Sequence, residues 1–188
     1  MRSDDLYSLP PDLPVPVDDG ACDHLSGARG PAIALPSTLG GTVRLDRPTA
    51  RWTVVYAYPR TGQPTVESPP GWDQIPGARG CTPQNCAYRD LYHDLVRLGA
   101  EVYGLSTQTT DYQREMAERL HLPYPVLSDA ALELTTALRL PTFRYADWTL
   151  LRRFSLVLQE GRIVKVFYPV FPSNADSGWV IDWLGTQR

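Results

Sequence analysis

The spacing of hydrophobic residues along the chain predicts buried strands that alternate with amphipathic helices. Two apolar runs, residues 52–58 and 101–106, have the length of strands and few polar positions, so we expect both to be buried on two faces. Between them, apolar side chains at helical spacing over residues 85–98 predict a helix that ends at Gly99. From Ile33 onward, the chain therefore has the pattern of a folded domain.

Shorter elements continue this alternation in the second half of the chain. Helices are predicted at residues 111–120, 131–140 and 176–184, with a short strand at residues 124–128. Strands at 153–158 and 162–167 flank Glu160-Gly161, which is typical of a β-hairpin, and residues 42–45 predict half of an earlier hairpin. The closing helix is predicted to place three residues on its apolar face: Trp179, Val180 and Trp183.

The order of these elements predicts an α/β fold, a mixed β-sheet with helices on both faces. We assign the domain to residues 31–188, preceded by an extended Pro-rich arm at residues 1–30, where prolines exclude a helix or a central strand. The arm is either a disordered tail or a segment packed on the domain or on a partner subunit. Residues 60–79 form a loop with four prolines and no periodicity, and loops of this length are usually functional or disordered.

Composition narrows the class of protein. The 188 residues are 43% apolar, enough for one domain with a real core, and the net charge of −3 gives no broad cationic surface for nucleic acid or anionic lipid. No apolar run approaches the roughly 18 residues of a membrane helix, and the acidic, proline-broken start does not resemble a signal peptide. Three cysteines make no disulfide framework, so we expect a cytoplasmic protein with reduced thiols.

Cys81 and Cys86 are the candidate reactive residues, because they lie where the long loop gives way to a helix. A thiol in the first helical turn faces unpaired backbone N–H groups and the positive end of the helix dipole, which favour the nucleophilic thiolate. Pro83 suits an early helical position, where its missing N–H has no consequence. This reasoning makes Cys81 the reactive cysteine, although a cysteine on a helix face is most often a small buried hydrophobe. Cys22, in the arm, is interpreted as a bystander thiol.

The spacing of the two cysteines sets a geometric condition on any bond between them. Five positions along an intact α-helix separate two Cα atoms by roughly 8–9 Å, whereas a disulfide needs them within about 7 Å. If both sulfurs take part in one reaction, the first helical turn has to unwind. A zinc site is not predicted, because the histidines lack the spacing of metal ligands: His24, His93 and His121.

With these segments in place, the sequence resembles the peroxiredoxins, specifically the Q-type or bacterioferritin-comigratory group, over roughly residues 31–188. The resemblance rests on landmarks that occur in the family's order: Tyr58-Pro59, Gly80-Cys81-Thr82 with Cys86 and Tyr88-Arg89-Asp90, Leu105-Ser106-Thr107, Leu127-Ser128-Asp129, and Arg153 at the head of its strand. It implies a thioredoxin-like fold and a thiol-dependent peroxidase that reduces hydrogen peroxide or organic hydroperoxides.

The resemblance also implies roles for individual residues. Cys81 would attack the peroxide O–O bond and become a sulfenic acid, Cys86 would condense with it to a disulfide, and thioredoxin or a similar dithiol would reduce that disulfide. Arg153 would be a fixed cation that favours the thiolate and stabilises the departing oxygen. Alternation places Arg152 on the opposite face of the strand, so only one of the two arginines can serve. The substrate site would include Pro59, Gly80 and Thr82, and neither a cofactor nor a metal is implied.

Two features depart from the family pattern. The segment between Pro59 and Cys81 is short in the family, whereas here it holds 21 residues. The family's Thr or Ser three residues before the cysteine is Ala78 in this chain, which leaves Thr61 or Thr82 to supply a hydroxyl. The insertion contains four apolar side chains that could cap the site, bind a bulkier hydroperoxide or form a subunit contact: Pro69, Pro70, Trp72 and Ile75.

Two other functions remain open at this point. The Cys81/Cys86 pair could be a redox-sensing switch that exposes a surface to a partner, or the chain could be a thiol-disulfide oxidoreductase. The absence of any C-x-x-C motif disfavours the second of these. The peroxidase hypothesis predicts that the partners are a peroxide and a dithiol reductant, and that the protein binds neither nucleic acid nor a membrane. It predicts a monomer or a homodimer.

Overall fold

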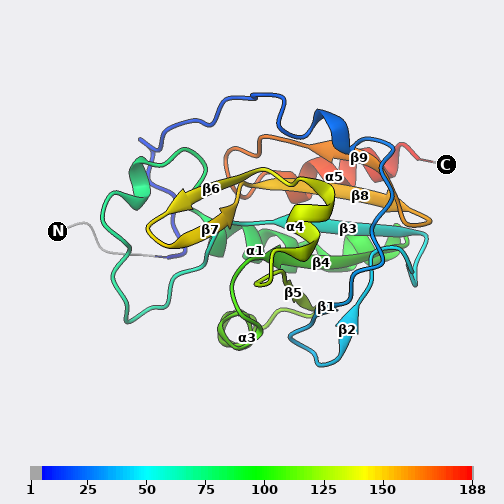
Figure 1. The fold of residues 1–188 in the computed structure, drawn as a ribbon, viewed down its shortest axis with the longest axis horizontal. Helices are drawn as coiled ribbons and strands as arrows, with labels where there is room; N and C mark the ends of the chain where they lie inside the picture. The colour runs from blue at the N-terminus through cyan, green and yellow to red at the C-terminus, as the bar shows by residue number, and fades with distance from the viewer. Residues whose placement is uncertain (1–5, 188) are drawn as a thin grey trace.

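A five-stranded mixed sheet forms the centre of the computed structural model, which describes residues 6–187 (Figure 1). The strands lie in the order β5-β4-β3-β8-β9, and their bounds are Trp52–Ala57 (β3), Ala100–Ser106 (β4), Val126–Ser128 (β5), Phe154–Gln159 (β8) and Arg162–Phe167 (β9). The first three run parallel to one another, while β8 is antiparallel to β3 and to β9. The α/β fold with a mixed sheet is confirmed.

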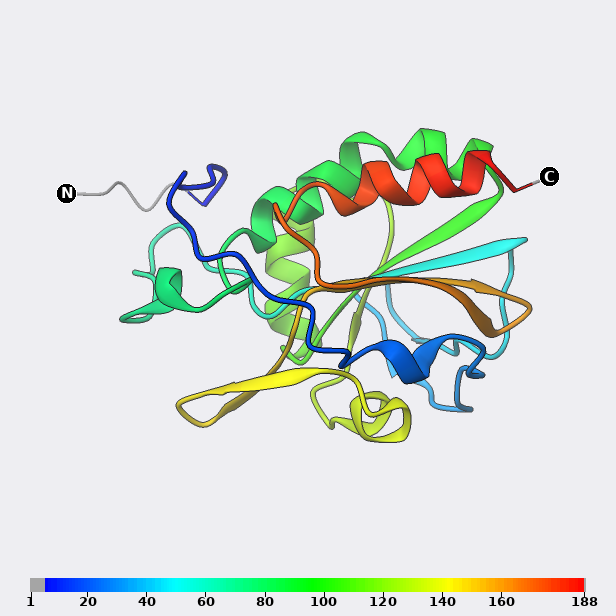
Figure 2. The same cartoon turned by 90° about the horizontal axis from the view of Figure 1, so that it is seen from above.

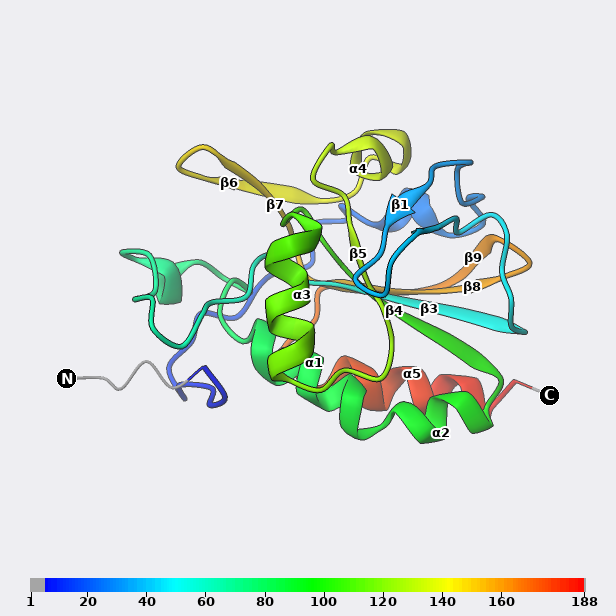
Figure 3. The same cartoon turned by 90° about the horizontal axis from the view of Figure 1, so that it is seen from below.

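Helices cover both faces of the sheet (Figures 2 and 3). One face carries α1 (Cys81–Asp90), α2 (Tyr92–Arg97) and α5 (Asp176–Gly185), and the other carries α4 (Glu133–Leu138). The helix α3 (Thr110–Arg119) lies beside β5 at the edge of the sheet (Figure 1), and its Met116 packs into the same core as α1, α2 and α5. Alternation along β3 explains the two layers, because Val54 and Tyr56 face the first set of helices while Val55 and Ala57 face the second. Every residue of β3 is buried, as the apolar run predicted.

The predicted helix at residues 85–98 is in fact two helices, and α1 begins earlier, at Cys81. The backbone turns at Leu91, where φ is −98° and ψ is 6°. Apolar spacing gave no sign of this break, because Leu95 on the second helix and Leu98 just after it still pack into the same core. In the closing helix, Val180 is buried and Trp183 packs edge-on against Trp52.

The prediction that Trp179 lies on the buried face of this helix is wrong. Its side chain is 37% exposed and touches Phe167 at the rim of the sheet. It lies one position before Val180 on a helix with 100° between successive residues, so the two side chains cannot both point straight into the core.

A second hairpin, β6 (Thr142–Tyr145) with β7 (Trp148–Leu151), was not predicted from the sequence. Its two-residue turn places Ala146 at φ 48°, where glycine or asparagine would normally mark such a turn. The hairpin lies at the same end of the molecule as the inserted loop (Figure 2). Trp72, in the short 3-10 helix Trp72–Gln74 of that loop, packs against Phe143 and Tyr145.

The N-terminal segment lies along the molecule rather than apart from it, from residue 6 onward (Figure 1). Cys22 and Leu25, around the 3-10 helix Asp23–Leu25, are buried in the core that also holds α4. The early hairpin is present as β1 (Leu35–Pro36) and β2 (Thr42–Val43). Among the described residues, no helix has the length and apolar character to cross a membrane.

Candidate active site

Cys81 is the first residue of α1, at the point where the inserted loop ends. Gly80 makes the abrupt change of direction with φ at 102°, a backbone conformation that glycine adopts without strain. A Cβ atom at this position would lie 2.1 Å from Oγ of Ser173, so only glycine fits. The turn and the start of the helix place the Cys81 side chain in a buried position with 4% of it exposed.

The Cys81 sulfur lies against the guanidinium of Arg153, which immediately precedes β8. Nη2 of Arg153 is 3.3 Å from Sγ and also donates to the carbonyl oxygens of Gly77, Ala78 and Arg79. The carbonyl oxygen of Ala78 is 3.5 Å from the same sulfur. Three backbone acceptors thus fix a buried cation beside the sulfur, where it can stabilise negative charge that develops on a leaving group.

A chain of buried polar groups continues from Arg153 into the protein. Nη1 of Arg153 donates to Oε1 of Gln84, and Nε2 of Gln84 donates to Oδ2 of Asp176 at 2.6 Å. The hydroxyl of Ser155 donates to the same carboxylate oxygen at 2.7 Å and lies 2.9 Å from the Tyr88 hydroxyl. Burial raises the pKa of Asp176 to about 6, against the effect of its hydrogen bonds.

A cavity of about 170 Å³ is lined by Cys81 together with Gly80 and Thr82. Thr61 also lines it, as does Trp72 of the inserted loop. Pro59 is buried at the end of β3 and does not line the cavity. Two of the three predicted substrate-site residues, Gly80 and Thr82, therefore line the cavity, and the third, Pro59, does not.

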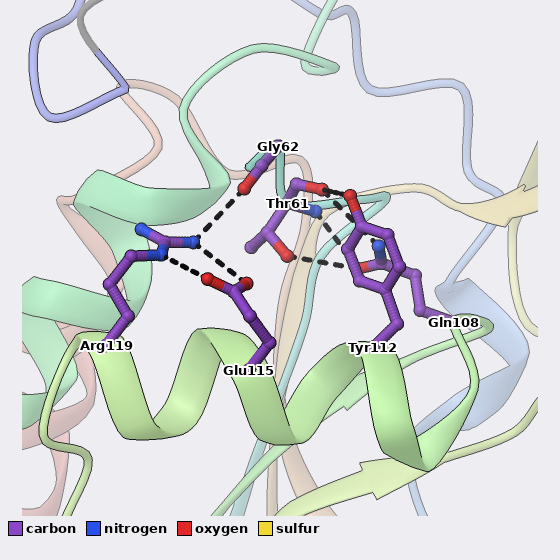
Figure 4. Close-up of polar contacts among 6 residues, drawn as sticks. All are labelled: Thr61, Gly62, Gln108, Tyr112, Glu115 and Arg119. Carbon is purple, nitrogen blue, oxygen red and sulfur yellow. Dashed lines mark hydrogen bonds and ion pairs between the residues drawn. The ribbon is translucent and has the colours of Figure 1, made fainter. Parts of the chain in front are cut away.

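Polar side chains around α3 hold residues 61–62 at this cavity (Figure 4). Oε1 of Gln108 accepts from the backbone N–H of Thr61 at 3.0 Å and from its hydroxyl at 3.3 Å, while the Tyr112 hydroxyl donates to the Thr61 carbonyl at 3.0 Å. Arg119, paired with Glu115, donates to the carbonyl of Gly62 at 3.1 Å. Because the Thr61 hydroxyl donates its hydrogen bond to Gln108, its lone pairs can accept a hydrogen bond from another group.

Arg60 lies between this cavity and a larger one of about 370 Å³. Its guanidinium carbon is 3.9 Å from the centre of the Trp148 ring and 5.2 Å from that of Tyr112, and all three residues line both cavities. The larger cavity extends from there to Leu132 and to Leu150 of β7. The stacked arginine thus lies at the boundary between the two cavities.

Cys86 and Cys22 lie in environments that oppose ionisation. Cys86, half-buried on α1, packs against the core, and this burial raises the pKa of its thiol. Cys22 is buried beside three aspartates, and its pKa is raised to about 12. All three cysteines are free thiols. No group of three or more His, Cys, Asp or Glu side chains suited to a metal ion occurs among residues 6–187.

Sequence reasoning did not identify the polar groups behind Arg153. Gln84 follows Cys81 by one helical turn, but a glutamine near a helix start carries no distinctive signal. Asp176 is 92 residues from Gln84, and an acidic residue at the start of a helix is ordinarily explained by the helix dipole. Only the fold brings these two residues and Ser155 together.

Comparison with known proteins places these features in a family. Residues 25–179 match the Redoxin family model. A chloroplastic peroxiredoxin Q from Sedum lineare is 30% identical over 142 residues, which cover 76% of this chain and 67% of that protein. The chain spans between 58% and 70% of the length of the plant relatives that it matches.

Solved structures show the same fold. Peroxidoxin BcpB from Mycobacterium tuberculosis has a TM-score of 0.69 at 22% identity, with 87% of this chain and 97% of that one covered. The bacterioferritin comigratory protein of Xanthomonas campestris, studied for alkyl peroxide reduction, has a TM-score of 0.64 at 18% identity, with coverage of 93% and 98%.

Proposed function

Because the chain belongs to the Redoxin family and, within it, to the peroxiredoxins related to peroxiredoxin Q, we propose that it is a thiol peroxidase with Cys81 as its nucleophile. The observation that carries this proposal is the 3.3 Å contact between the Cys81 sulfur and the fixed guanidinium of Arg153, at the wall of a small cavity. Nucleophile, cation and space for a substrate meet at one point.

The first half of the reaction uses groups that are already in contact. The Cys81 thiolate attacks the terminal oxygen of a hydroperoxide, the S–O bond forms as the O–O bond breaks, and the alcohol leaves as an alkoxide that solvent protonates. Arg153 stabilises the negative charge as it moves from sulfur to the departing oxygen. Thr61, held by Gln108, would accept a hydrogen bond from the hydroperoxide O–H group and so orient the substrate. This assigns to Thr61 the part that Ala78 cannot play.

The second half requires α1 to open. The Cys86 thiol attacks the sulfenic sulfur of Cys81, the S–S bond forms and water leaves, and a thioredoxin-like dithiol then reduces the disulfide by exchange. Both cysteines lie in one continuous helix, so they cannot bond while it is intact. We propose a reducing compartment, cytoplasmic as expected from the composition, as the source of this dithiol.

The two cavities support organic hydroperoxides as substrates besides hydrogen peroxide. The cavity at Cys81 has room for a small hydroperoxide, and the larger one beyond Arg60 offers space for a longer chain next to apolar side chains. The related protein of Xanthomonas campestris was studied for alkyl peroxide reduction. Trp72 and Trp148, in the inserted loop and the β6–β7 hairpin, line this route.

Stopped-flow peroxide consumption with a thioredoxin recycling system tests the proposal. Cys81→Ser should abolish consumption, whereas Cys86→Ser should react once and then accumulate sulfinic acid on Cys81, detectable by mass spectrometry. Cys22→Ser is the control and should behave as wild type. Stoichiometric oxidation of wild type without turnover would instead support a redox-sensing switch, and a sulfenic acid trapped mainly on Cys86 would refute the assignment of Cys81.

A further inference from the structure

Asp176, the first residue of α5, carries a carboxylate that is fully buried between α1 and β8. Its Oδ2 accepts hydrogen bonds from Gln84 and Ser155, while Oδ1 has no hydrogen-bond partner among the described residues. No ion pair to Asp176 forms within residues 6–187, so only more distant positive charge balances it. A buried carboxylate without a direct counter-ion opposes stability, and such groups concentrate at functional sites.

Gln84 connects this carboxylate to the cation at the reactive sulfur. An amide has one donating end and one accepting end, and here Nε2 faces Asp176 while Oε1 faces Nη1 of Arg153. The reverse orientation would set the amide N–H groups against a guanidinium that only donates, and the amide oxygen against a carboxylate. Arg153 and ionised Asp176 therefore both select the orientation in which Gln84 accepts from the guanidinium and donates to the carboxylate.

We propose that Asp176 is a positioning residue for the reaction of Cys81: its carboxylate orients the Gln84 amide, and the amide oxygen holds Arg153 with Nη2 against the sulfur. This role rests on the peroxidase function proposed above. Arg153 also has three backbone acceptors of its own. Losing Asp176 thus weakens the placement of the guanidinium without releasing it, and the reaction slows without stopping.

The surroundings of Asp176 make this effect depend on pH. Among the described residues, two ionisable side chains face it: Arg153, which immediately precedes β8, and Tyr88 on α1, whose hydroxyl lies 2.9 Å from that of Ser155. Arginine stays charged at accessible pH, and burial raises the pKa of Tyr88 far above its usual value. Neither changes its charge between pH 5 and 8, whereas Asp176, with a pKa raised to about 6, gains a proton as the pH falls through that range.

The test compares Asp176→Asn with wild type in two reactions of Cys81 between pH 5 and 8. One is the second-order reaction with hydrogen peroxide by stopped flow, and the other is alkylation by iodoacetamide, followed by mass spectrometry of the Cys81 peptide. At pH 7.5 we expect Asp176→Asn to be about tenfold slower in both. The difference should shrink below pH 6, where wild type is itself protonated. Asp182→Asn removes the same charge from the exposed side of α5 and should match wild type.

A second variant separates positioning from general damage to the fold. Gln84→Met breaks the link but leaves Asp176 in contact with Ser155, and it serves in place of Asp176→Asn if that variant does not fold. Because both act through one path, the double variant should be no slower than the slower single variant. Losses that multiply, or a pH-independent difference, would overturn the proposal, as would a wild-type rate in Asp176→Asn. If wild type consumes no peroxide, the peroxidase function fails while alkylation still decides the role of Asp176.

Discussion

Two adjacent arginines illustrate how the site is specified at the scale of single residues. Arg153 is buried and contacts the Cys81 sulfur, whereas Arg152 points to the other side, where it pairs with Asp19 at 2.9 Å and donates to the Tyr168 hydroxyl at 3.2 Å. Alternation along a strand predicts that they separate. Which of them meets the cysteine depends on the register of β8 against the rest of the fold.

This difference gives a matched pair of variants. Arg153→Met should slow the reaction with hydrogen peroxide about a hundredfold, because the departing oxygen loses its fixed hydrogen-bond donor. Arg152→Met removes the same charge one residue away and should change the rate little. Second-order rate constants from stopped flow decide between them. Equal losses in the two variants would contradict the geometry of the site.

Other residues of the site could be named from the sequence only as candidates or not at all. Cys81 and Cys86 could be identified because cysteine is a rare residue and both lie near the start of a helix. Thr61 is one of two threonines that could replace the hydroxyl missing at Ala78. The choice of Thr61 depends on Gln108 and Tyr112, 47 and 51 residues away, which fix its backbone. Such polar contacts follow no periodicity, so they become visible only when the fold joins distant segments.

At the scale of elements, apolar periodicity predicted the buried strands and most helices because burial itself produces the pattern. The β8–β9 hairpin was predicted because Glu160-Gly161 marks its turn, and both residues adopt positive φ. The β6–β7 hairpin was not predicted, because the positive-φ position of its turn is occupied by Ala146 and not by a residue typical of such turns. Local signals therefore identify elements whose turns use the expected residues and miss those whose turns do not.

Polar contacts to Asn85 help to hold the helix that carries both cysteines. The Tyr56 hydroxyl donates to Oδ1 of Asn85 at 2.6 Å, Nδ2 of Asn85 donates to the Cys81 carbonyl at 2.8 Å, and the Tyr124 hydroxyl donates to the Asn85 carbonyl at 3.0 Å. Hydrogen bonds are short-ranged and directional, so they are lost together when the first turns of α1 unwind. Formation of the Cys81–Cys86 disulfide would therefore release Asn85 as well as Gln84.

Amide hydrogen exchange should detect this release. On oxidation, protection at residues 85–89 should fall, because a Cys81–Cys86 bond is incompatible with an intact helix, while Val54 in β3 and Leu156 in β8 stay protected. Cys86→Ser treated with one equivalent of peroxide is the control, since it forms a sulfenic acid without a disulfide and should keep its protection. Unchanged exchange in disulfide-bonded wild type would rule out local unwinding.

At the scale of the whole molecule, three segments distant in sequence converge on the Cys81 end. The inserted loop packs Trp72 on the β6–β7 hairpin, and Tyr145 of that hairpin donates to the Pro70 carbonyl at 2.8 Å. The N-terminal segment adds Leu6, which lines the Cys81 cavity, and Leu9, which lies against Gly80. The inserted loop and the N-terminal segment therefore both form part of the wall of the candidate site.

If these walls restrict access, opening one of them should favour large substrates over small ones. Leu6→Ser with Leu9→Ser removes apolar contacts of the N-terminal segment at the cavity but leaves the buried Cys22 and Leu25 anchored. The ratio of the rate constants for cumene hydroperoxide and hydrogen peroxide should rise several-fold, since hydrogen peroxide already fits the cavity. Val17→Ser alters an exposed residue of the same segment and should leave the ratio unchanged. A ratio equal to that of wild type in the double variant would mean that the N-terminal segment does not limit access to Cys81.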